Sequence, residues 1–156
     1  MATINKRTTA KIEGDFVVFL IGMRINKFYK INKWFPVVMA MPKMLNELYQ
    51  NPDSGFLGAQ SWFGKTTIMV QYWKSFEHLT VYARNPEKNH YPAWVAFNKK
   101  IKGTGDVGVW HETYKIQGGN YECIYSNMPL FGLAKASLSI DVNAHNDSAS
   151  QRIEHT

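Results

Sequence analysis

The chain of 156 residues is 45% hydrophobic and 14% aromatic, which is enough apolar material for one compact core and too little length for two comfortable domains. Its formal net charge is +6, but the basic residues are spread along the chain and form no nucleic-acid-binding stripe. The single cysteine, Cys123, excludes an internal disulfide and a cysteine-based zinc site.

Both ends of the sequence are polar. They predict a flexible N-terminal arm over residues 1–14 and a disordered C-terminal tail over 141–156, with one domain over 15–140. The start has no recognisable signal peptide, and no apolar run approaches the roughly 20 residues of a spanning helix. We therefore expect a cytoplasmic protein with no membrane and no nucleic-acid partner.

The first half of this domain alternates between strand and helix patterns. Residues 15–24 form a continuous apolar run bounded by charges, which predicts a strand buried on both faces. Residues 32–50 have apolar positions at helical spacing, with Asn32 as the predicted N-cap and Pro42 as a predicted kink or restart. Residues 56–64 and 66–74 read as a hairpin around a Gly-Lys turn.

The second half continues this alternation. Ser75 is the predicted N-cap of a helix through Arg84, and Pro92 predicts that a further helix begins near Tyr91, with His90 at its entrance. Residues 106–116 and 120–129 predict a last hairpin. The order β-α-β-β-α-β-β is typical of an α+β ferredoxin-like βαββαβ plait with one extra strand.

The predicted sheet is apolar on both faces, although this fold places helices on only one of them. Residues 16, 18 and 20 face one side of the first strand, and 17, 19 and 21 face the other. An apolar face of that size invites association. We therefore expect a second sheet to cover it, most simply in a twofold homodimer.

Two ionisable residues interrupt the apolar segment GVWHETY. With a period of two, His111 shares a face with Val109 and Thr113, whereas Glu112 shares the other with Trp110 and Tyr114. Both faces are expected to be buried, so each residue is either part of a site or a hydrogen-bonded core or interface group. Because they point apart, they cannot serve as a simple acid and base on one atom.

His90 is the other histidine with a predicted role. A helix N-terminus disfavours the imidazolium, so a neutral His90 fits a base or a metal ligand, and the alternative is a half-exposed capping residue. A dry aromatic interior with a few polar groups, Asn127 among them, is typical of a pocket for a flat apolar molecule. The alternative is a well-packed core.

Long stretches of the sequence resemble a known family. These are FVVFLIGMRINK, KWFPVVMAMPKML, VQYWKSFEHLTVYAR, H..AW..FN, GDVGVWHETY and YECIYSNMPLFGLAKA. From about Thr8 to Ala136, the chain resembles the fumagillin-type monooxygenase-like family of unassigned function. That family belongs to the superfamily of dimeric α+β barrels with the antibiotic-biosynthesis monooxygenases. The resemblance implies a homodimer of two ferredoxin-like sheets packed face to face.

The resemblance also narrows the chemistry to two cases. Members of the superfamily oxidise aromatic or polyketide substrates with oxygen and no cofactor, whereas relatives bind haem. In the haem-degrading branch a helix histidine is the iron ligand, and His90 looks like its counterpart. The asparagine and tryptophan that accompany it in that branch have no secure counterpart in this sequence.

The expected function is a cofactor-independent monooxygenase acting on a small aromatic or polyketide-like apolar substrate in a pocket by the dimer interface. His90 or His111 would be the base, Glu112 would orient it or balance its charge, and Tyr114 and Asn127 would donate hydrogen bonds. The expected walls of the pocket are Trp62, Trp73, Trp94 and Trp110. The alternatives are a haem-binding enzyme or carrier with His90 as axial ligand, and a non-catalytic ligand-binding module.

Overall fold

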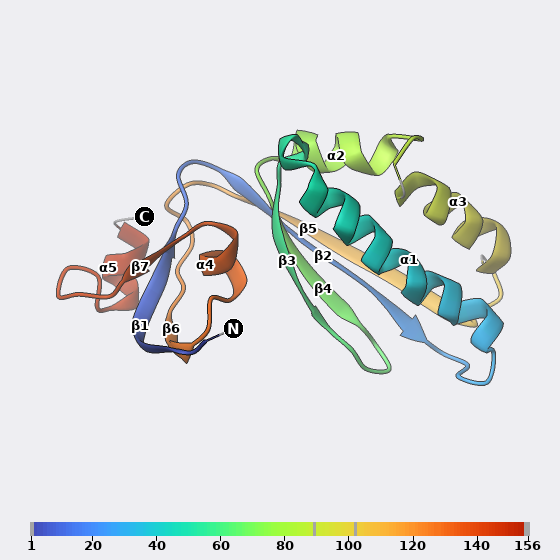
Figure 1. Cartoon of the computed structure of the whole chain (residues 1–156), viewed down its shortest axis with the longest axis horizontal. Coiled ribbons are helices and arrows are strands. Elements are labelled where there is room, and N and C mark those ends of the chain that lie inside the picture. The colour runs from blue at the N-terminus through green and yellow to red at the C-terminus, as the bar shows by residue number, and fades with distance from the viewer. Residues whose placement is uncertain (1, 89, 102, 155–156) are drawn as a thin grey trace.

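The computed structural model describes residues 2–88, 90–101 and 103–154 (Figure 1). Within these ranges, seven side chains lie outside the description: His90, Ala93, Trp94, Asn98, Lys100, Ile101 and Glu154. The strands are β1 (Ile4–Lys11), β2 (Phe16–Ile25), β3 (Phe56–Trp62), β4 (Ile68–Trp73), β5 (Val107–Ile116), β6 (Tyr125–Met128) and β7 (Leu138–Asp141). The helices are α1 (Ile31–Gln50), η1 (Pro52–Ser54), α2 (Phe76–Arg84), α3 (His90–Ile101), α4 (Gly132–Ala136) and α5 (Ala149–Glu154).

The larger part of the fold is the predicted ferredoxin-like plait. Its four-stranded sheet has the order β3-β4-β2-β5, and every neighbouring pair is antiparallel. Helices α1, α2 and α3 lie together on one side of this sheet (Figure 1). The elements β2-α1-β3-β4-α2/α3-β5 therefore confirm the α+β, βαββαβ assignment.

The predicted last hairpin is wrong. Strand β6 pairs with β1, not with β5, in a separate three-stranded sheet of order β6-β1-β7. Residues 4–11, assigned to a flexible arm by the sequence, are therefore the central strand of that sheet, with Thr8, Thr9 and Ala10 buried. The polar composition of β1 hid it because its hydrogen-bond partners lie more than 100 residues away.

The C-terminal residues also differ from their predicted disorder. Strand β7 ends at Asp141, and helix α5 follows at 149–154. Arg152 of α5 is buried, donates through Nε to Glu122 Oε1 at 2.6 Å, and also donates to the carbonyl of Asp147 at 2.6 Å. These paired contacts satisfy a buried guanidinium and fasten a segment that has little apolar surface of its own.

Helix α1 continues through both of its prolines. Its N-cap is Lys30, not Asn32, and it runs for 20 residues without restarting at Pro42. Pro42 is exposed, so water can reach the carbonyl that the missing N–H leaves without a donor. The predicted restart is therefore wrong, whereas the predicted Ser75 cap of α2 is confirmed, because its side chain accepts from the His78 N–H.

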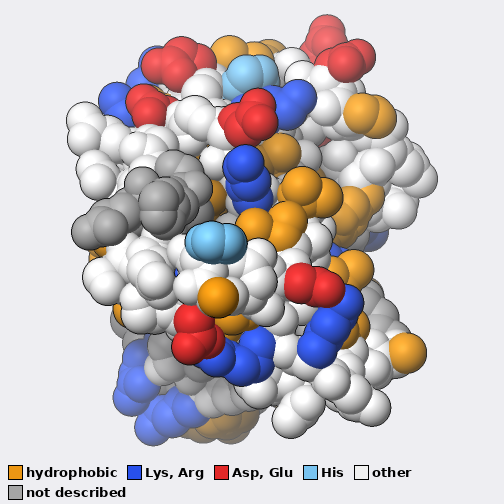
Figure 2. Space-filling view, turned by 90° about the vertical axis from the view of Figure 1, so that its left-hand side faces the viewer, with side chains coloured by type: hydrophobic (Ala, Val, Ile, Leu, Met, Phe, Trp, Pro, Cys, Tyr) orange, Lys and Arg blue, Asp and Glu red, His pale blue; other side chains and the backbone are white. Residues whose placement is uncertain are grey.

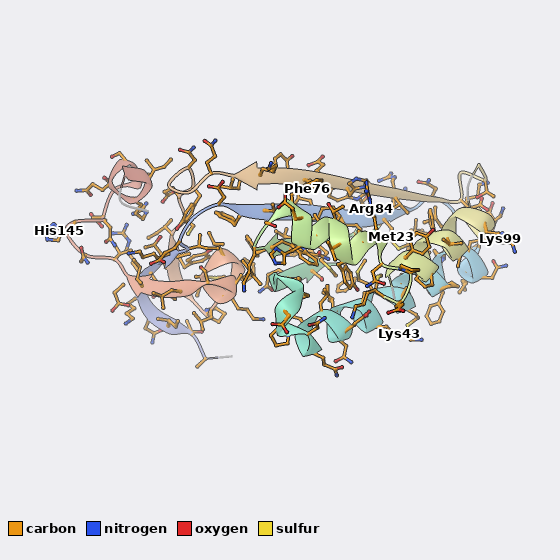
Figure 3. The ribbon with its side chains drawn as sticks, turned by 90° about the horizontal axis from the view of Figure 1, so that it is seen from above. Met23, Lys43, Phe76, Arg84, Lys99 and His145 are labelled. Carbon is orange, nitrogen blue, oxygen red and sulfur yellow. The ribbon has the colours of Figure 1, made fainter. Side chains whose placement is uncertain are left out.

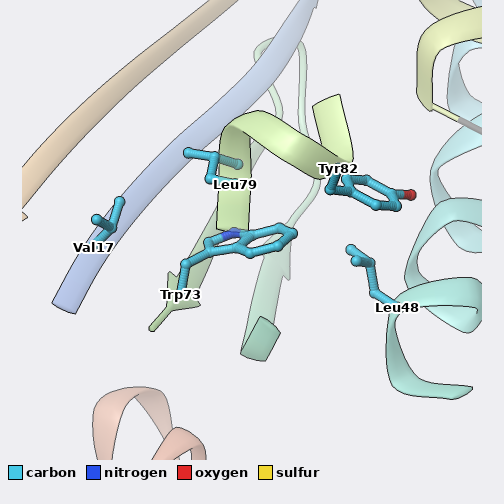
Figure 4. Close-up of a cluster of buried hydrophobic side chains, with 5 residues drawn as sticks. All are labelled: Val17, Leu48, Trp73, Leu79 and Tyr82. Carbon is cyan, nitrogen blue, oxygen red and sulfur yellow. The ribbon is translucent and has the colours of Figure 1, made fainter. Parts of the chain in front are cut away.

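Two separate core clusters hold the helices on the sheet. In the first, Val17 and Trp73 pack against Leu48 of α1 and Leu79 and Tyr82 of α2 (Figure 4). In the second, Met23, Ile25 and Val107 pack against Trp34, Val37, Val38 and Phe97. On β2, Phe19, which packs against the first cluster, and Ile21 stay partly exposed although they face the helices.

The opposite face of the sheet is covered at one end. There Phe16, with Val18 and Tyr72 beside it, packs against Leu133 and Ala134 of α4. We call this side the helix-free face, because α1, α2 and α3 all lie on the other side. Away from α4 it carries Leu20, Ile68, Val70 and Trp62, all at least partly exposed. The prediction of a sheet with two apolar faces is confirmed, and most of the helix-free face lacks a covering layer within the described residues.

Candidate functional site

The strand β5 separates its two ionisable residues as the alternation predicted. In the register with β2, His111 lies opposite Ile21 and Glu112 lies opposite Leu20. Ile21 has the parity of Val17, which packs against the helices, so His111 lies on the helix side and Glu112 on the helix-free side. Both are exposed, contrary to the expectation of burial, because β5 is an edge strand.

On the helix side, His111 lies next to the two partly exposed residues of β2, Phe19 and Ile21. Its ring lies against that of Phe19, with 5.8 Å between the ring centroids. Strand β4, on the other side of β2, contributes Gln71, which pairs in register with Phe19 and is only 6% exposed. We call Phe19, Ile21, Gln71 and His111 the helix-side cluster.

Gln71 is a candidate site residue that the sequence reasoning missed. Its Oε1 accepts from Trp73 Nε1 at 2.9 Å, and its Nε2 lies 3.2 Å from Met69 Sδ. A side-chain amide carries two N–H donors, so one of them remains for a ligand above the sheet. The sequence did carry a signal for it. Gln71 interrupts the apolar run IMVQYW, and the residues two positions before and after it, Met69 and Trp73, share its face of the strand.

On the helix-free side Glu112 and Tyr114 form a pair. Tyr114 Oη donates to Glu112 Oε2 at 2.6 Å, and this hydrogen bond, with the charge of the carboxylate, raises the pKa of Tyr114. The phenol is therefore held protonated, as the donor of the pair. The hydrogen bond ties the two groups to each other, and the alternation of β5 places both on the opposite side of the sheet from His111.

Trp110 shares that face and lies over Gly22. Its buried Nε1 has no hydrogen-bond partner among the described residues. A Cβ at Gly22 would lie 2.6 Å from Trp110 Nε1 and 2.0 Å from the carbonyl oxygen of Thr67, so only glycine fits beneath the indole. An unpaired buried donor costs stability, so the position of this indole is an unfavourable one for the described chain alone.

The remaining predicted site residues do not gather in one place. Trp73 is fully buried in the first core cluster, and Trp62 is exposed and packs edge-on against Phe131. Asn127 is exposed on β6 of the other sheet, with a left-handed φ of 52°. His90 is the first residue of α3 and Trp94 lies one turn later, and the side chains of both lie outside the described residues.

Asp106 is the most strongly perturbed carboxyl group described, and its role is structural. It is buried and contacts Lys27 Nζ at 2.8 Å and Lys30 Nζ at 2.9 Å. Hydrogen bonds from these two ammonium groups lower the pKa of Asp106 to about 2. This ion-pair group fixes the loop before α1 to the start of β5.

Three further findings limit the chemistry of the described residues. No group of three His, Cys, Asp or Glu side chains among them could hold a metal ion. None of their helices is long and apolar enough to cross a membrane. A small pocket of about 60 Å³ between β3 and α4, bordered by Tyr49 and Lys135, is too small for a drug-sized ligand.

Comparisons with known proteins agree with this fold. The model of the family described as "Monooxygenase af470-like" matches residues 16–133. A curated relative, "Monooxygenase af470" of Aspergillus fumigatus, is 26% identical over 88% of this chain, and this chain spans 56% of its length. A crystal structure of aldoxime dehydratase superposes on 92% of this chain with a TM-score of 0.68 at 14% identity, and the match covers 45% of that chain.

A further structural likeness is weaker. A putative antibiotic biosynthesis monooxygenase from Caulobacter crescentus matches 67% of this chain and 91% of its own, with a TM-score of 0.47 and 11% identity. The aldoxime dehydratase match, at the higher TM-score, shows that the ferredoxin-like arrangement recurs in that enzyme.

Proposed function

Because this chain belongs to the monooxygenase af470-like family, we propose that it is an enzyme that oxidises a small apolar substrate with oxygen and no cofactor. The substrate class is an aromatic or polyketide-like molecule with an acidic phenol or methylene group. Such a molecule can supply the electrons for oxygen reduction once it has lost a proton. The protein then needs a base, an apolar surface and few donors for the oxygen of the substrate.

One observation carries this proposal. In the middle of a helix-covered sheet, packing should bury every side chain of a central strand, yet Phe19 and Ile21 stay partly exposed between the buried residues Val17 and Met23. The open apolar surface is bordered by His111, a base, and by the amide of Gln71, a donor. A flat substrate that rests on Phe19 would meet both groups.

The proposed reaction balances without a further reductant. His111 takes the proton from an activated CH₂ group, and Gln71 donates to the neighbouring oxyanion. The carbanion transfers its electrons to O₂ and a C–O bond forms. The resulting hydroperoxide loses water, so that CH₂ and O₂ become C=O and H₂O. Phe19 and Ile21 hold the ring and keep water from the reacting carbon.

Glu112 and Tyr114 have no part in this proton transfer, since they lie on the other face. We propose instead that the helix-free face packs against the same face of a second copy. The uncovered residues Leu20, Ile68 and Val70 and the exposed Trp62 support this, because together they form an apolar surface on a sheet. The Glu112–Tyr114 pair would then lie at the rim of a homodimer.

Oxygen uptake tests the enzymatic proposal. We would screen anthrones and naphthols with an oxygen electrode, and compare the parent with His111→Gln. Loss of a general base should lower kcat about 100-fold or more. His145→Gln is the matched control, because His145 is exposed at the far end of the molecule (Figure 3). Undiminished turnover by His111→Gln would contradict the assignment of the base.

A further inference from the structure

The N-terminal half of α1 is apolar on its outer side as well as on its inner side. Val37 and Val38 point into the second core cluster. Ile31, Phe35 and Met39, spaced by four residues, line a neighbouring side that faces solvent and are between 47% and 58% exposed. A surface helix normally carries polar residues on its outer side.

The loop before the helix extends this surface. Phe28 is 54% and Tyr29 is 77% exposed. Phe28 and Phe35 both pack edge-on against Trp34, with centroid distances of 6.5 and 6.1 Å, and Trp34 Nε1 donates to the carbonyl of Phe28 at 3.0 Å. These contacts hold the aromatic rings in place at the surface. We call Phe28, Tyr29, Ile31, Phe35 and Met39 the α1 surface.

Basic residues predominate around the α1 surface. Between residues 24 and 46 the sequence has five basic residues and no acidic one. Lys27 and Lys30 pair with Asp106, while Lys43 is exposed on the outer side of α1 (Figure 3). The exposed Lys99 of α3 lies at the same end of the molecule (Figure 3). The apolar residues are therefore flanked by positive charge.

The turn between β3 and β4 adds to this end. Phe63 is 82% exposed in that turn, and Lys65 follows it, also exposed. The N–H of Ile25 donates to the carbonyl of Lys65 at 2.9 Å, which holds this turn beside the end of β2. This turn and the loop before α1 both lie at the lower edge of the molecule in Figure 1, on the side away from α2.

The opposite end of the molecule has a different character. Around β1, β7 and α5, acidic and basic side chains are interspersed (Figure 2). Several of them pair there, including Lys6 with Asp141 at 2.7 Å and Arg7 with Asp147. Mixed and paired charges of this kind are ordinary for a solvated surface. The exposed apolar surface flanked mainly by basic residues is a feature of the α1 end.

We propose that the α1 surface binds peripherally to an anionic lipid bilayer. Exposed aromatic and aliphatic side chains beside lysines are the combination that enters the interface of a bilayer and attracts anionic headgroups. A second copy fits less well, since a twofold contact through this surface would bring the lysines of both copies together. This surface departs from the expectation of no membrane partner, and the binding does not depend on the oxidation chemistry.

Vesicle sedimentation tests the proposal with the full chain. The probes are phosphatidylcholine vesicles with and without phosphatidylserine. We expect the parent to pellet with the anionic vesicles and less at high salt, and the double variant Phe35→Ser, Met39→Ser to bind about tenfold or more weakly. Phe76→Ser is the matched control, because Phe76 is 43% exposed on α2, away from the α1 surface (Figure 3).

A charge variant keeps the test decisive if the double variant fails to fold. Lys43→Glu replaces an exposed group, and it should weaken pelleting with anionic vesicles only. Three results would overturn the proposal: no pelleting of the parent with anionic vesicles, an equal loss in Phe76→Ser, or self-association without vesicles that the double variant abolishes. The last result would assign the α1 surface to a second copy of the chain.

Discussion

His111 and Glu112 are consecutive in the chain, yet they lie on opposite faces of the same sheet. Their partners across the β2–β5 register are Ile21 and Leu20. One residue therefore lies on the side of the sheet that carries α1, α2 and α3, and the other lies on the side that these helices leave open. This relationship assigns proton transfer and association to different sides of one strand, and the two functions can be tested separately.

We expect Val70→Glu to convert the proposed homodimer into a monomer. Val70 lies on the helix-free face opposite Leu20, and a carboxylate there would be buried without a partner in a sheet-to-sheet contact. Light scattering after size-exclusion chromatography measures the mass. Lys74→Glu, an exposed change beyond the end of β4, is the control. A parent that is monomeric at all concentrations would contradict the homodimer.

Replacing Gln71 by leucine should lower both stability and turnover. The change removes the acceptor of Trp73 Nε1, a buried N–H donor, and should cost about 1–3 kcal/mol in the free energy of unfolding. Urea unfolding measures that cost. Gln71→Glu keeps an acceptor for the indole but loses the amide donor, and burial of its carboxylate adds a stability cost of its own, so it should also lower kcat. Equal kcat values for Gln71→Glu and the parent would remove Gln71 from the proposed site.

A haem titration separates the cofactor-free proposal from the haem alternative. We expect no saturable shift of the Soret band with the parent protein. A shift that saturates at one haem per chain and disappears in His90→Ala would contradict the proposal and assign His90 as the axial ligand. His78→Ala is the control, because His78 also lies at the start of a helix, where its Nδ1 contacts the Ser75 hydroxyl at 2.9 Å.

The Asp106 ion pairs should make stability depend on pH in the acidic range. The pKa of Asp106 is lowered to about 2 in the folded state from its ordinary 3.8, so its stabilising effect is complete above the unfolded value and is lost as the pH falls through the folded one. Asp106→Asn should therefore lower the urea midpoint at neutral pH. The difference from the parent should shrink between about pH 5 and pH 2. A difference that stays constant over this range would contradict the assignment.

Local patterns in the sequence predicted the elements of the ferredoxin-like plait. The β2 run, the α1 periodicity, the Ser75 cap and the β3–β4 turn each depend on residues close in the chain. The second sheet could not be predicted in this way. Its strands β1, β6 and β7 come from the two ends of the chain, and polar residues such as those of β1 give no local signal of pairing.

The candidate site, like the fold, was only partly predictable from local sequence patterns. Alternation along GVWHETY determined that His111 and Glu112 point apart, since a strand has a period of two whatever surrounds it. Only the tertiary structure decided that β5 is the edge strand, that His111 lies beside Phe19 on the helix side of the sheet, and that Gln71 lies in register with Phe19. Strand order and helix placement arise from contacts between segments far apart in the chain, and those contacts decide which faces meet and which remain open.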